Sequence, residues 1–246
     1  MPKFPLVARL MVFLAMVALA GCAGISTNGP PPGAVNPLDT SRSLIASDAA
    51  VLSDEDIARI LTTRVEVPQE MRIAVLYLAH ESEMSQWRDR GIEAYRDAMS
   101  PVQKLRESDR VFDVSFLPSF LLPNEKSVPL IREAAARYQA DWVLIVKTTA
   151  RQFWKTRAIG KDEARARCEA ECAVLDVRTG TIPYTSIAWG ESGSRKTDED
   201  LSLYETSLRV ESEAVKLAMA ENVAGLLSFL DRLGEAGGDD GAASGK

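Results

Sequence analysis

The 246-residue sequence has little of what many enzymes and metalloproteins require. It contains one histidine, His80, so any mechanism with a histidine base would have to use that residue. Its three cysteines form no zinc-type motif, because no second pair of cysteines or histidines accompanies them. The acidic residues Asp198, Glu199 and Asp200 lack the glycine and terminal glutamate of a calcium loop, and neither glycine-rich phosphate motif occurs. The sequence therefore predicts no cofactor, no metal site and no enzyme.

An excess of positive charge and a long apolar run are also missing. The chain has 29 basic and 35 acidic residues, a net charge of −6. Nucleic-acid binding requires clustered cations that displace counterions, so nucleic acid is excluded as a partner. The apolar run at residues 10–20 is shorter than the roughly 20 residues of a membrane-spanning helix.

The N-terminus nevertheless has the pattern of a secretory signal. Lys3 and Arg9 precede the short apolar run, and Leu19-Ala20-Gly21-Cys22 follows it. This tetrapeptide resembles the lipobox of bacterial lipoproteins. The resemblance implies that residues 1–21 are removed and that Cys22 becomes the lipidated first residue.

The lipid would attach the protein to a membrane. By analogy with proteobacterial sorting, Ala23, which stands where an aspartate would retain the protein in the inner membrane, implies the outer membrane. Each buried methylene of an acyl chain contributes about 0.8 kcal/mol, so several chains on Cys22 give stable anchoring. Without residues 1–21 the chain has 27 basic and 35 acidic residues, a net charge of −8. Such an acidic protein needs the lipid itself, and not electrostatic attraction, to stay at an anionic membrane.

Composition divides the chain into five segments. We expect a signal peptide at 1–21, a lipidated flexible tether at 22–41, an N-terminal helical extension at 42–71, an α/β domain at 72–234 and a disordered tail at 235–246. In the extension, Ser53 is the expected N-cap of a short helix with acidic residues in its first turn. Ile57, Ile60 and Leu61 form its apolar stripe, which we expect to pack on the α/β domain.

Hydrophobic patterning predicts a mixed sheet with helices packed on it. We expect strands at 72–78, 111–117, 141–150, 164–177 and 181–191, and helices at 84–99, 127–138 and 198–233. Pro101 either ends the first of these helices or begins another short one. The resulting order is β-α-β-α-β-β-β-α, an α/β (α+β) fold with a long C-terminal helix. That helix has Thr197 as its expected cap and Gly234 as its expected end, and it either protrudes or breaks near residues 209–212.

The prediction of a strand at 164–177 rests on a strict alternation of residue types. Its small and apolar residues occupy one face and its charged residues the other, although alanine, arginine and glutamate also favour a helix. In a strand, Cys168 and Cys172 would lie about 13 Å apart, too far for a disulfide. We therefore expect two buried free thiols.

Two segments resemble a known group of lipoproteins. Ala140-Asp141-Trp142-Val143-Leu144-Ile145 follows an alanine-rich helix, and Leu175-Asp176-Val177-Arg178-Thr179-Gly180 forms a hairpin turn. With the element order, they resemble periplasmic lipoproteins with a TolB-amino-terminal-like domain, including curli-secretion-type lipoproteins and, more distantly, predicted rhombotarget lipoproteins. The resemblance spans residues 72–233 and implies a role in envelope assembly, secretion or regulation.

Candidate contact residues cluster near strand ends. Trp154, Lys155, Arg157 and Trp189 are the possible partner contacts, together with the sheet edge and the final helix. Arg151, Lys155, Arg157 and Lys161 also form a basic patch, for which a solvated loop is the simpler interpretation than an anion or glycan site.

The sequence also contains two segments that would suit a catalytic alternative. Leu78-Ala79-His80 and Gly190-Glu191-Ser192-Gly193-Ser194 are similar to the histidine and nucleophile motifs of chymotrypsin-like proteases. Three sizeable helices leave no room for two six-stranded barrels, so we expect the second motif to be a loop before the final helix. A hydrolase is thus a remote alternative.

The sequence as a whole favours an outer-membrane-anchored periplasmic lipoprotein that is a non-catalytic protein-binding module. Its expected partners are the membrane, through lipid on Cys22, and an envelope protein. The alternative is a self-assembling ring subunit of a secretion channel.

Overall fold

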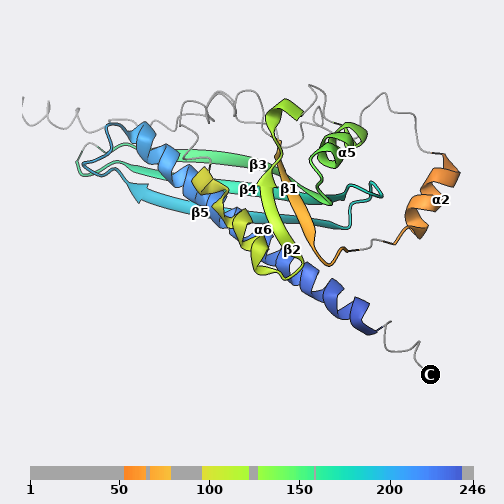
Figure 1. The fold of residues 1–246 in the computed structure, drawn as a ribbon. Coiled ribbons are helices and arrows are strands. Elements are labelled where there is room, and N and C mark those ends of the chain that lie inside the picture. Colours follow the sequence, from red (N-terminus) through yellow and green to blue (C-terminus); the bar gives the residue numbers. More distant parts are fainter. Residues whose placement is uncertain (1–52, 65–66, 79–95, 122–126, 158, 240–246) are drawn as a thin grey trace, which may run out of the picture.

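The computed structural model describes residues 53–64, 67–78, 96–121, 127–157 and 159–239 (Figure 1). The expected signal peptide, Cys22, the tether, His80 and most of the expected helix at 84–99 lie outside the described residues. The elements are α2 (Asp54–Thr62), β1 (Met71–Tyr77), η2 (Ser100–Glu107), β2 (Val111–Phe116), η3 (Ser119–Leu121), α5 (Val128–Arg137), β3 (Trp142–Lys155), β4 (Glu163–Asp176), β5 (Tyr184–Arg195) and α6 (Leu203–Asp239). Pro101 lies in the first turn of η2 and so begins a short helix.

The five strands form one mixed sheet in the order β2-β1-β3-β4-β5, which confirms the expected fold class. β2 and β3 pair parallel to β1, whereas β3, β4 and β5 pair antiparallel. Only residues 142–146 of β3 pair with β1. Beyond them, residues 147–155 of β3, 163–171 of β4 and 187–195 of β5 continue together, and we call this part the ribbon.

α6 crosses one face of the sheet and buries the larger core (Figure 1). The alternate residues of β4 that face it are small or apolar: Ala164, Ala166, Cys168, Ala170, Cys172 and Val174. This confirms the strand that the alternation predicted. Both cysteines are free and buried, as expected, and burial raises the pKa of the Cys172 thiol to about 12.

α5 covers the opposite face only at the parallel end of the sheet. Its Ile131, Ala134 and Ala135 are buried in a second core, which also contains Val143 and Ile145 of β3. Because both β3 residues precede Lys147, this core ends where the ribbon begins.

α6 differs from its expected bounds at both ends. It begins at Leu203, because Ser202 Oγ accepts a hydrogen bond from the Glu205 backbone N–H at 3.3 Å and so takes the capping role predicted for Thr197. It also continues through Gly234 to Asp239, so residues 235–239 are helical and not part of a disordered tail. A glycine costs a helix about 1 kcal/mol relative to alanine and does not by itself end it.

No break occurs in α6 near residues 209–212. Glu211 there is buried and accepts a hydrogen bond from the Gln152 side chain of β3. Farther along, Asn222 donates to the Ala170 carbonyl at 2.9 Å and accepts from the Ser186 hydroxyl at 2.6 Å. Polar residues that interrupt the apolar stripe therefore attach the helix to the sheet. No described helix is both long enough and apolar enough to cross a membrane.

The β4–β5 hairpin has the predicted turn, but its second strand includes residues that were expected to form a loop. Asp176 accepts the backbone N–H groups of Arg178 and Thr179, and Gly180 adopts a positive φ of 79°, so the predicted turn is present. β5 then runs from Tyr184 to Arg195. Residues 190–194 are consequently strand and not a loop, because they pair with residues 164–168 of β4.

α2 has the predicted cap but not the predicted docking. Ser53 accepts a hydrogen bond from the Asp56 backbone N–H at 3.1 Å. No residue of α2 is buried, and Ile57, Ile60 and Leu61 are 42%, 38% and 80% exposed. A stripe of three aliphatic side chains thus remains in solvent.

Candidate binding face

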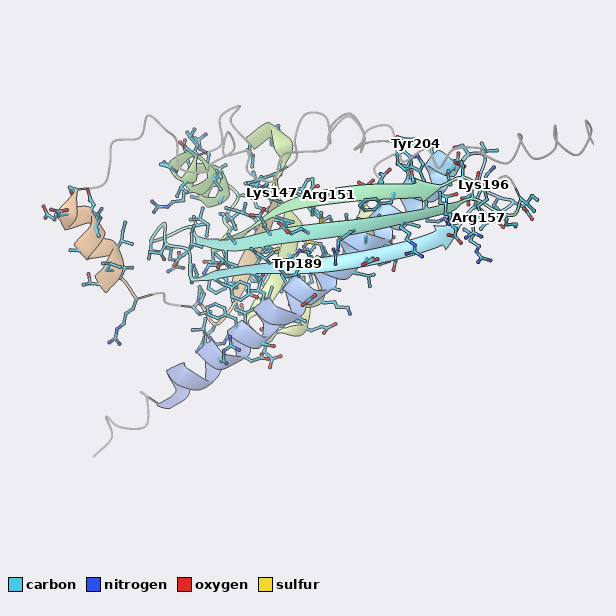
Figure 2. All side chains as sticks on the ribbon, turned by 180° about the vertical axis from the view of Figure 1, so that it is seen from behind. Lys147, Arg151, Arg157, Trp189, Lys196 and Tyr204 are labelled. Atoms are coloured by element: carbon cyan, nitrogen blue, oxygen red, sulfur yellow. The ribbon has the colours of Figure 1, made fainter. Side chains whose placement is uncertain are left out.

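The ribbon has a second face, opposite α6, on which charged and aromatic side chains alternate with the buried ones. Strand register places it in five rows, and we call these residues the open face. The rows are Lys147-Glu171-Ile187, Thr149-Glu169-Trp189, Arg151-Arg167-Glu191, Phe153-Arg165-Gly193 and Lys155-Glu163-Arg195. Figure 2 views the molecule with the ribbon in front of α6 and labels Lys147, Arg151 and Trp189.

The open face follows from the binary pattern of β4. Alanine and cysteine on one side allow α6 to approach closely, and charged residues on the other side favour solvent. The approach is closest at Gly190, where a Cβ atom would lie 1.9 Å from the Ala214 carbonyl oxygen. α6 therefore fixes the ribbon from behind and leaves its open face accessible.

Three large apolar side chains lie on this face in solvent. Phe153, Ile187 and Trp189 are 58%, 55% and 57% exposed. The Trp189 indole N–H donates to Glu169 Oε2 at 3.0 Å, which holds the ring against the neighbouring strand. Exposed aromatic rings with a fixed orientation are typical of protein contact surfaces.

Ion pairs hold both ends of the open face. At one end, Glu163 accepts from Arg157 at 3.0 Å and from Arg195 at 3.2 Å. Burial raises the pKa of Glu163, but the hydrogen bonds from Arg195 and Arg157 outweigh it, and the pKa lies below its ordinary value. At the other end, Lys147 pairs with Glu171 at 2.9 Å.

The positive charges of three arginines in the middle of the open face are less well neutralised by acidic residues. Arg151 lies directly across from Arg167, and Arg165 is two residues from Arg167 on the same face. Across the whole described part of the chain, the side chains of Arg151 and Arg165 have no hydrogen-bond or ion-pair partner, and the Arg167 guanidinium lies 4.0 Å from the Glu191 carboxylate. We call Arg151, Arg165 and Arg167 the arginine cluster.

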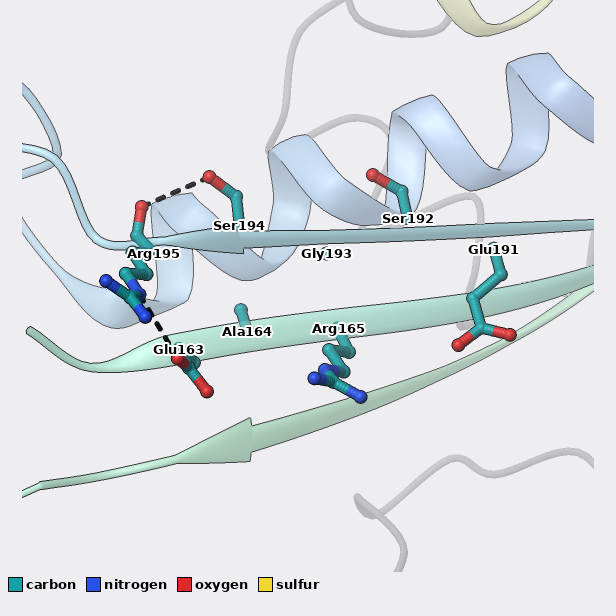
Figure 3. A pocket seen from close by; sticks show the side chains of 8 residues that line it. All are labelled: Glu163, Ala164, Arg165, Glu191, Ser192, Gly193, Ser194 and Arg195. Carbon is teal, nitrogen blue, oxygen red and sulfur yellow. Dashed lines mark hydrogen bonds and ion pairs between the residues drawn. The ribbon is translucent and has the colours of Figure 1, made fainter.

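A cavity of about 360 Å³ lies beside the cluster (Figure 3). Its lining comes from residues 163–165 of β4 and 191–195 of β5. In Figure 3, Arg165 and Glu191 extend to one side of the ribbon, and Ser192 and Ser194 extend to the α6 side. Gly193 gives Arg165 space, since a Cβ there would lie 3.2 Å from Arg165 Cγ.

The structure does not gather the four predicted contact residues at one place. Trp154 lies within β3, not in a loop, and is half-buried on the α6 side, whereas Lys155 is on the open face. Trp189 is on the open face too, six residues along β5 from the row of Lys155, or about 20 Å. Arg157 follows the end of β3 and pairs with Glu163.

The predicted basic patch is rearranged as well. Lys161 pairs with Asp198 at 3.1 Å, and Arg157 is engaged by Glu163, so neither contributes an uncompensated charge. Arg151 instead joins Arg165 and Arg167, which the sequence analysis missed as site residues. Their charges were visible in the alternation of 164–177, but the register that brings Arg151 opposite Arg167 was not.

The residues of the protease alternative do not form a site in the described part of the chain. Ser192 is an ordinary residue of β5, half-buried beside α6, and His80 lies outside the described residues. Nor do the described residues contain a group of three or more histidine, cysteine, aspartate or glutamate side chains that could hold a metal ion.

No protein-family model and no curated protein matches this chain. Several solved structures are similar to part of it. A PelC dodecamer from Paraburkholderia phytofirmans is 12% identical, covering 62% of this chain and 87% of that one, with a TM-score of 0.33. Hypothetical protein CT253 from Chlamydia trachomatis is 17% identical over 65% and 98%, with a TM-score of 0.37. A putative lipoprotein from Caulobacter crescentus CB15 is 9% identical over 64% and 90%, with a TM-score of 0.35.

Proposed function

We propose that this chain is an outer-membrane-anchored periplasmic lipoprotein that binds another envelope protein through its open face and catalyses no reaction. The observation that carries the proposal is the exposure of Phe153, Ile187 and Trp189, each more than half accessible, on a sheet face that the described helices leave uncovered. The anchor rests on the Leu19-Ala20-Gly21-Cys22 motif, and the TolB-amino-terminal-like resemblance remains a prediction.

The ribbon is a suitable support for recognition because its shape is fixed before a partner arrives. β4 is paired along its length with β3 on one side and β5 on the other, and α6 packs behind all three. The five rows are spaced two residues apart along each strand, so the open face is about 27 Å long, and its three strands make it about 10 Å wide. A partner would therefore lose little free energy to reorganisation of this surface.

A position-specific crosslink tests the proposal. A photoreactive amino acid is placed at Ile187 on the open face of the full-length protein, in the cells that make it. The matched control position is Leu217, which is 45% exposed on α6. We expect one discrete protein adduct from Ile187 and none from Leu217. Equal adducts from both positions, or none from Ile187, would contradict an open-face partner.

The membrane anchor has its own test. Labelled palmitate should be incorporated into the native protein and not into Cys22→Ser, and the variant should leave the outer-membrane fraction. Since Cys22 lies far from the α/β domain in sequence, urea unfolding of the two proteins should agree. A variant that stays in the membrane fraction without label would show that the lipid is not the anchor.

A further inference from the structure

The arginine cluster is unfavourable for the fold as it stands. Arg151 and Arg167 are a directly opposed cross-strand pair, and like charges in that arrangement destabilise a strand pair. Arg165 adds a third positive charge in the next row, two residues from Arg167 along β4. The opposed pair of Arg151 and Arg167 therefore lowers stability, which suggests that the cluster meets a negatively charged group from outside.

The acidic residues of the open face do not neutralise them. Glu163 is shared by Arg157 and Arg195, and Glu171 pairs with Lys147. Glu169 accepts the indole N–H of Trp189. Only Glu191 approaches the cluster, at 4.0 Å from Arg167. The middle of the open face is thus positive in a protein whose total charge is −6.

We infer that the arginine cluster binds an acidic, extended segment of the partner protein. This inference rests on the proposed function and specifies the chemistry of that same face. Arg165 and Arg167 are two residues apart on one strand face, about 6.8 Å, and alternate side chains of an extended segment have the same spacing. Two carboxylates of such a segment could therefore meet the two guanidinium groups, which bind carboxylates in a planar, bidentate manner.

The surroundings of the cluster favour a peptide over other anions. Phe153 lies in the row of Arg165, and Trp189 lies one row beyond Arg167, so apolar contacts are available on both sides of the charges. The face is long and narrow, which suits a single extended segment. Arg165 and Gly193 also line the cavity beside the cluster.

Peptide binding by the full chain tests the inference. The probe is a fluorescein-labelled decapeptide of alternating glutamate and valine, and its counterpart replaces each glutamate with lysine. Binding is followed by fluorescence anisotropy at several salt concentrations. We expect the acidic peptide alone to bind, with an affinity that falls as salt rises.

Matched double variants locate the binding site. Arg165→Gln with Arg167→Gln removes two charges from the open face, and Arg59→Gln with Arg137→Gln removes two from α2 and α5, where these side chains are 72% and 71% exposed. The first pair should weaken peptide binding at least tenfold, and the second less than twofold. A single cooperative urea unfolding transition in each variant would show that both are folded.

Three results would overturn the inference. One is an acidic peptide that does not bind, and another is an equal loss in both double variants. The third is a polygalacturonate chain that binds through Arg165 and Arg167 while the peptide does not, which would identify an anionic glycan site. If the Ile187 adduct forms and survives the Arg165 and Arg167 substitutions, the proposed function stands and this inference fails. An Arg165- and Arg167-dependent peptide complex without any Ile187 adduct would show that the cluster binds acidic peptides but that the proposed open-face partner is absent from the cell.

Discussion

Gly190 is the residue on which the contact between α6 and the ribbon depends most directly. A Cβ atom at this position would lie 1.9 Å from the Ala214 carbonyl oxygen and 2.8 Å from the Ala218 nitrogen, both backbone atoms. Backbone atoms cannot rotate away as a flexible side chain can, so α6 or β5 would have to shift. We expect Gly190→Ala to lower the free energy of unfolding by about 3 kcal/mol, at the upper end of overpacking effects.

Gly193, three residues farther along β5, is the matched control for Gly190. Its nearest neighbour would be Arg165 Cγ at 3.2 Å, part of a flexible and exposed side chain. Gly193→Ala should therefore change stability by less than about 0.5 kcal/mol. Urea unfolding of both variants measures the difference. Equal losses would show that the α6 contact at Gly190 is not as close as described.

Asp200, which lies just before α6, makes the stability of the fold depend on pH. A hydrogen bond from the Thr197 backbone N–H, and others from the side chains of Thr197, Thr206 and Arg209, lower the pKa of Asp200 to about 2. Because this pKa is below the unfolded value of about 3.9, the carboxylate stabilises the fold above pH 4. That contribution is lost as the pH falls through 2.

Asp200→Asn removes the titrating group and so measures its contribution. The melting temperature of the native protein should exceed that of the variant at pH 5, and the two values should converge as the pH approaches 2. Thermal unfolding followed by circular dichroism in matched buffers provides the comparison. A constant difference across this range would show that Asp200 does not titrate with a lowered pKa.

At the scale of the elements, one substitution in the β3–β4 pair should raise stability and weaken binding. Arg151→Glu would replace the like-charged pair with Arg167 by an opposite-charged one. We expect the free energy of unfolding to rise by about 0.2–1 kcal/mol, the range of cross-strand charge pairs. The same substitution should weaken the binding of the acidic peptide.

Arg165→Glu separates the two effects. Arg165 faces Phe153 and Gly193 across the strands, so no opposed like charge is removed and no gain in stability is expected. Peptide binding should weaken as it does for Arg151→Glu. If Arg151→Glu instead destabilises the protein, the cluster is part of the fold's own electrostatics and not a binding site.

The elements that the sequence predicted well are those with a strict period. The alternation at 164–177 identified β4 and its buried face, and the continuous apolar run after Asp141 identified the buried start of β3. The bounds of α6 were missed because Ser202 and Glu205, a capping pair, stand only a few residues from Thr197 and the acidic residues after it. Both starts satisfy the local rules; in the structure Asp200 lies before the helix and accepts hydrogen bonds from Thr197, Thr206 and Arg209.

The site was predicted less well than the elements. Trp189 was among the expected contacts and lies on the open face, whereas Trp154 has a similar local pattern and faces α6. A shift of one residue moves a strand side chain to the opposite face, so the face of Trp154 depends on the register of β3 against β4. The arginine cluster depends on that register too, since Arg151 and Arg167 are far apart in sequence.

At the scale of the whole molecule, α6 runs from the ribbon to the parallel end of the sheet and extends past the sheet at its C-terminal end. Its 37 residues span about 55 Å, and among its residues up to 233, whose burial the structure describes, Leu230 is the last buried one. Figure 1 shows the end of α6 beyond the edge of the sheet. The molecule is therefore elongated along this helix, with the open face on the side that the helix leaves free.

This arrangement gives a prediction for the oligomeric state. A two-fold dimer through the open face would bring each copy's arginine cluster toward the other, and like charges across an interface are strongly unfavourable. We therefore expect no association through this face.

Light scattering of the secreted chain with Cys22→Ser, over a concentration series at low salt, should give the mass of a monomer or a small oligomer. The Arg165 and Arg167 double variant should give the same mass. A discrete ring of many subunits would contradict the binding-module proposal and favour a self-assembling secretion subunit, and export across the outer membrane would then be the activity to measure.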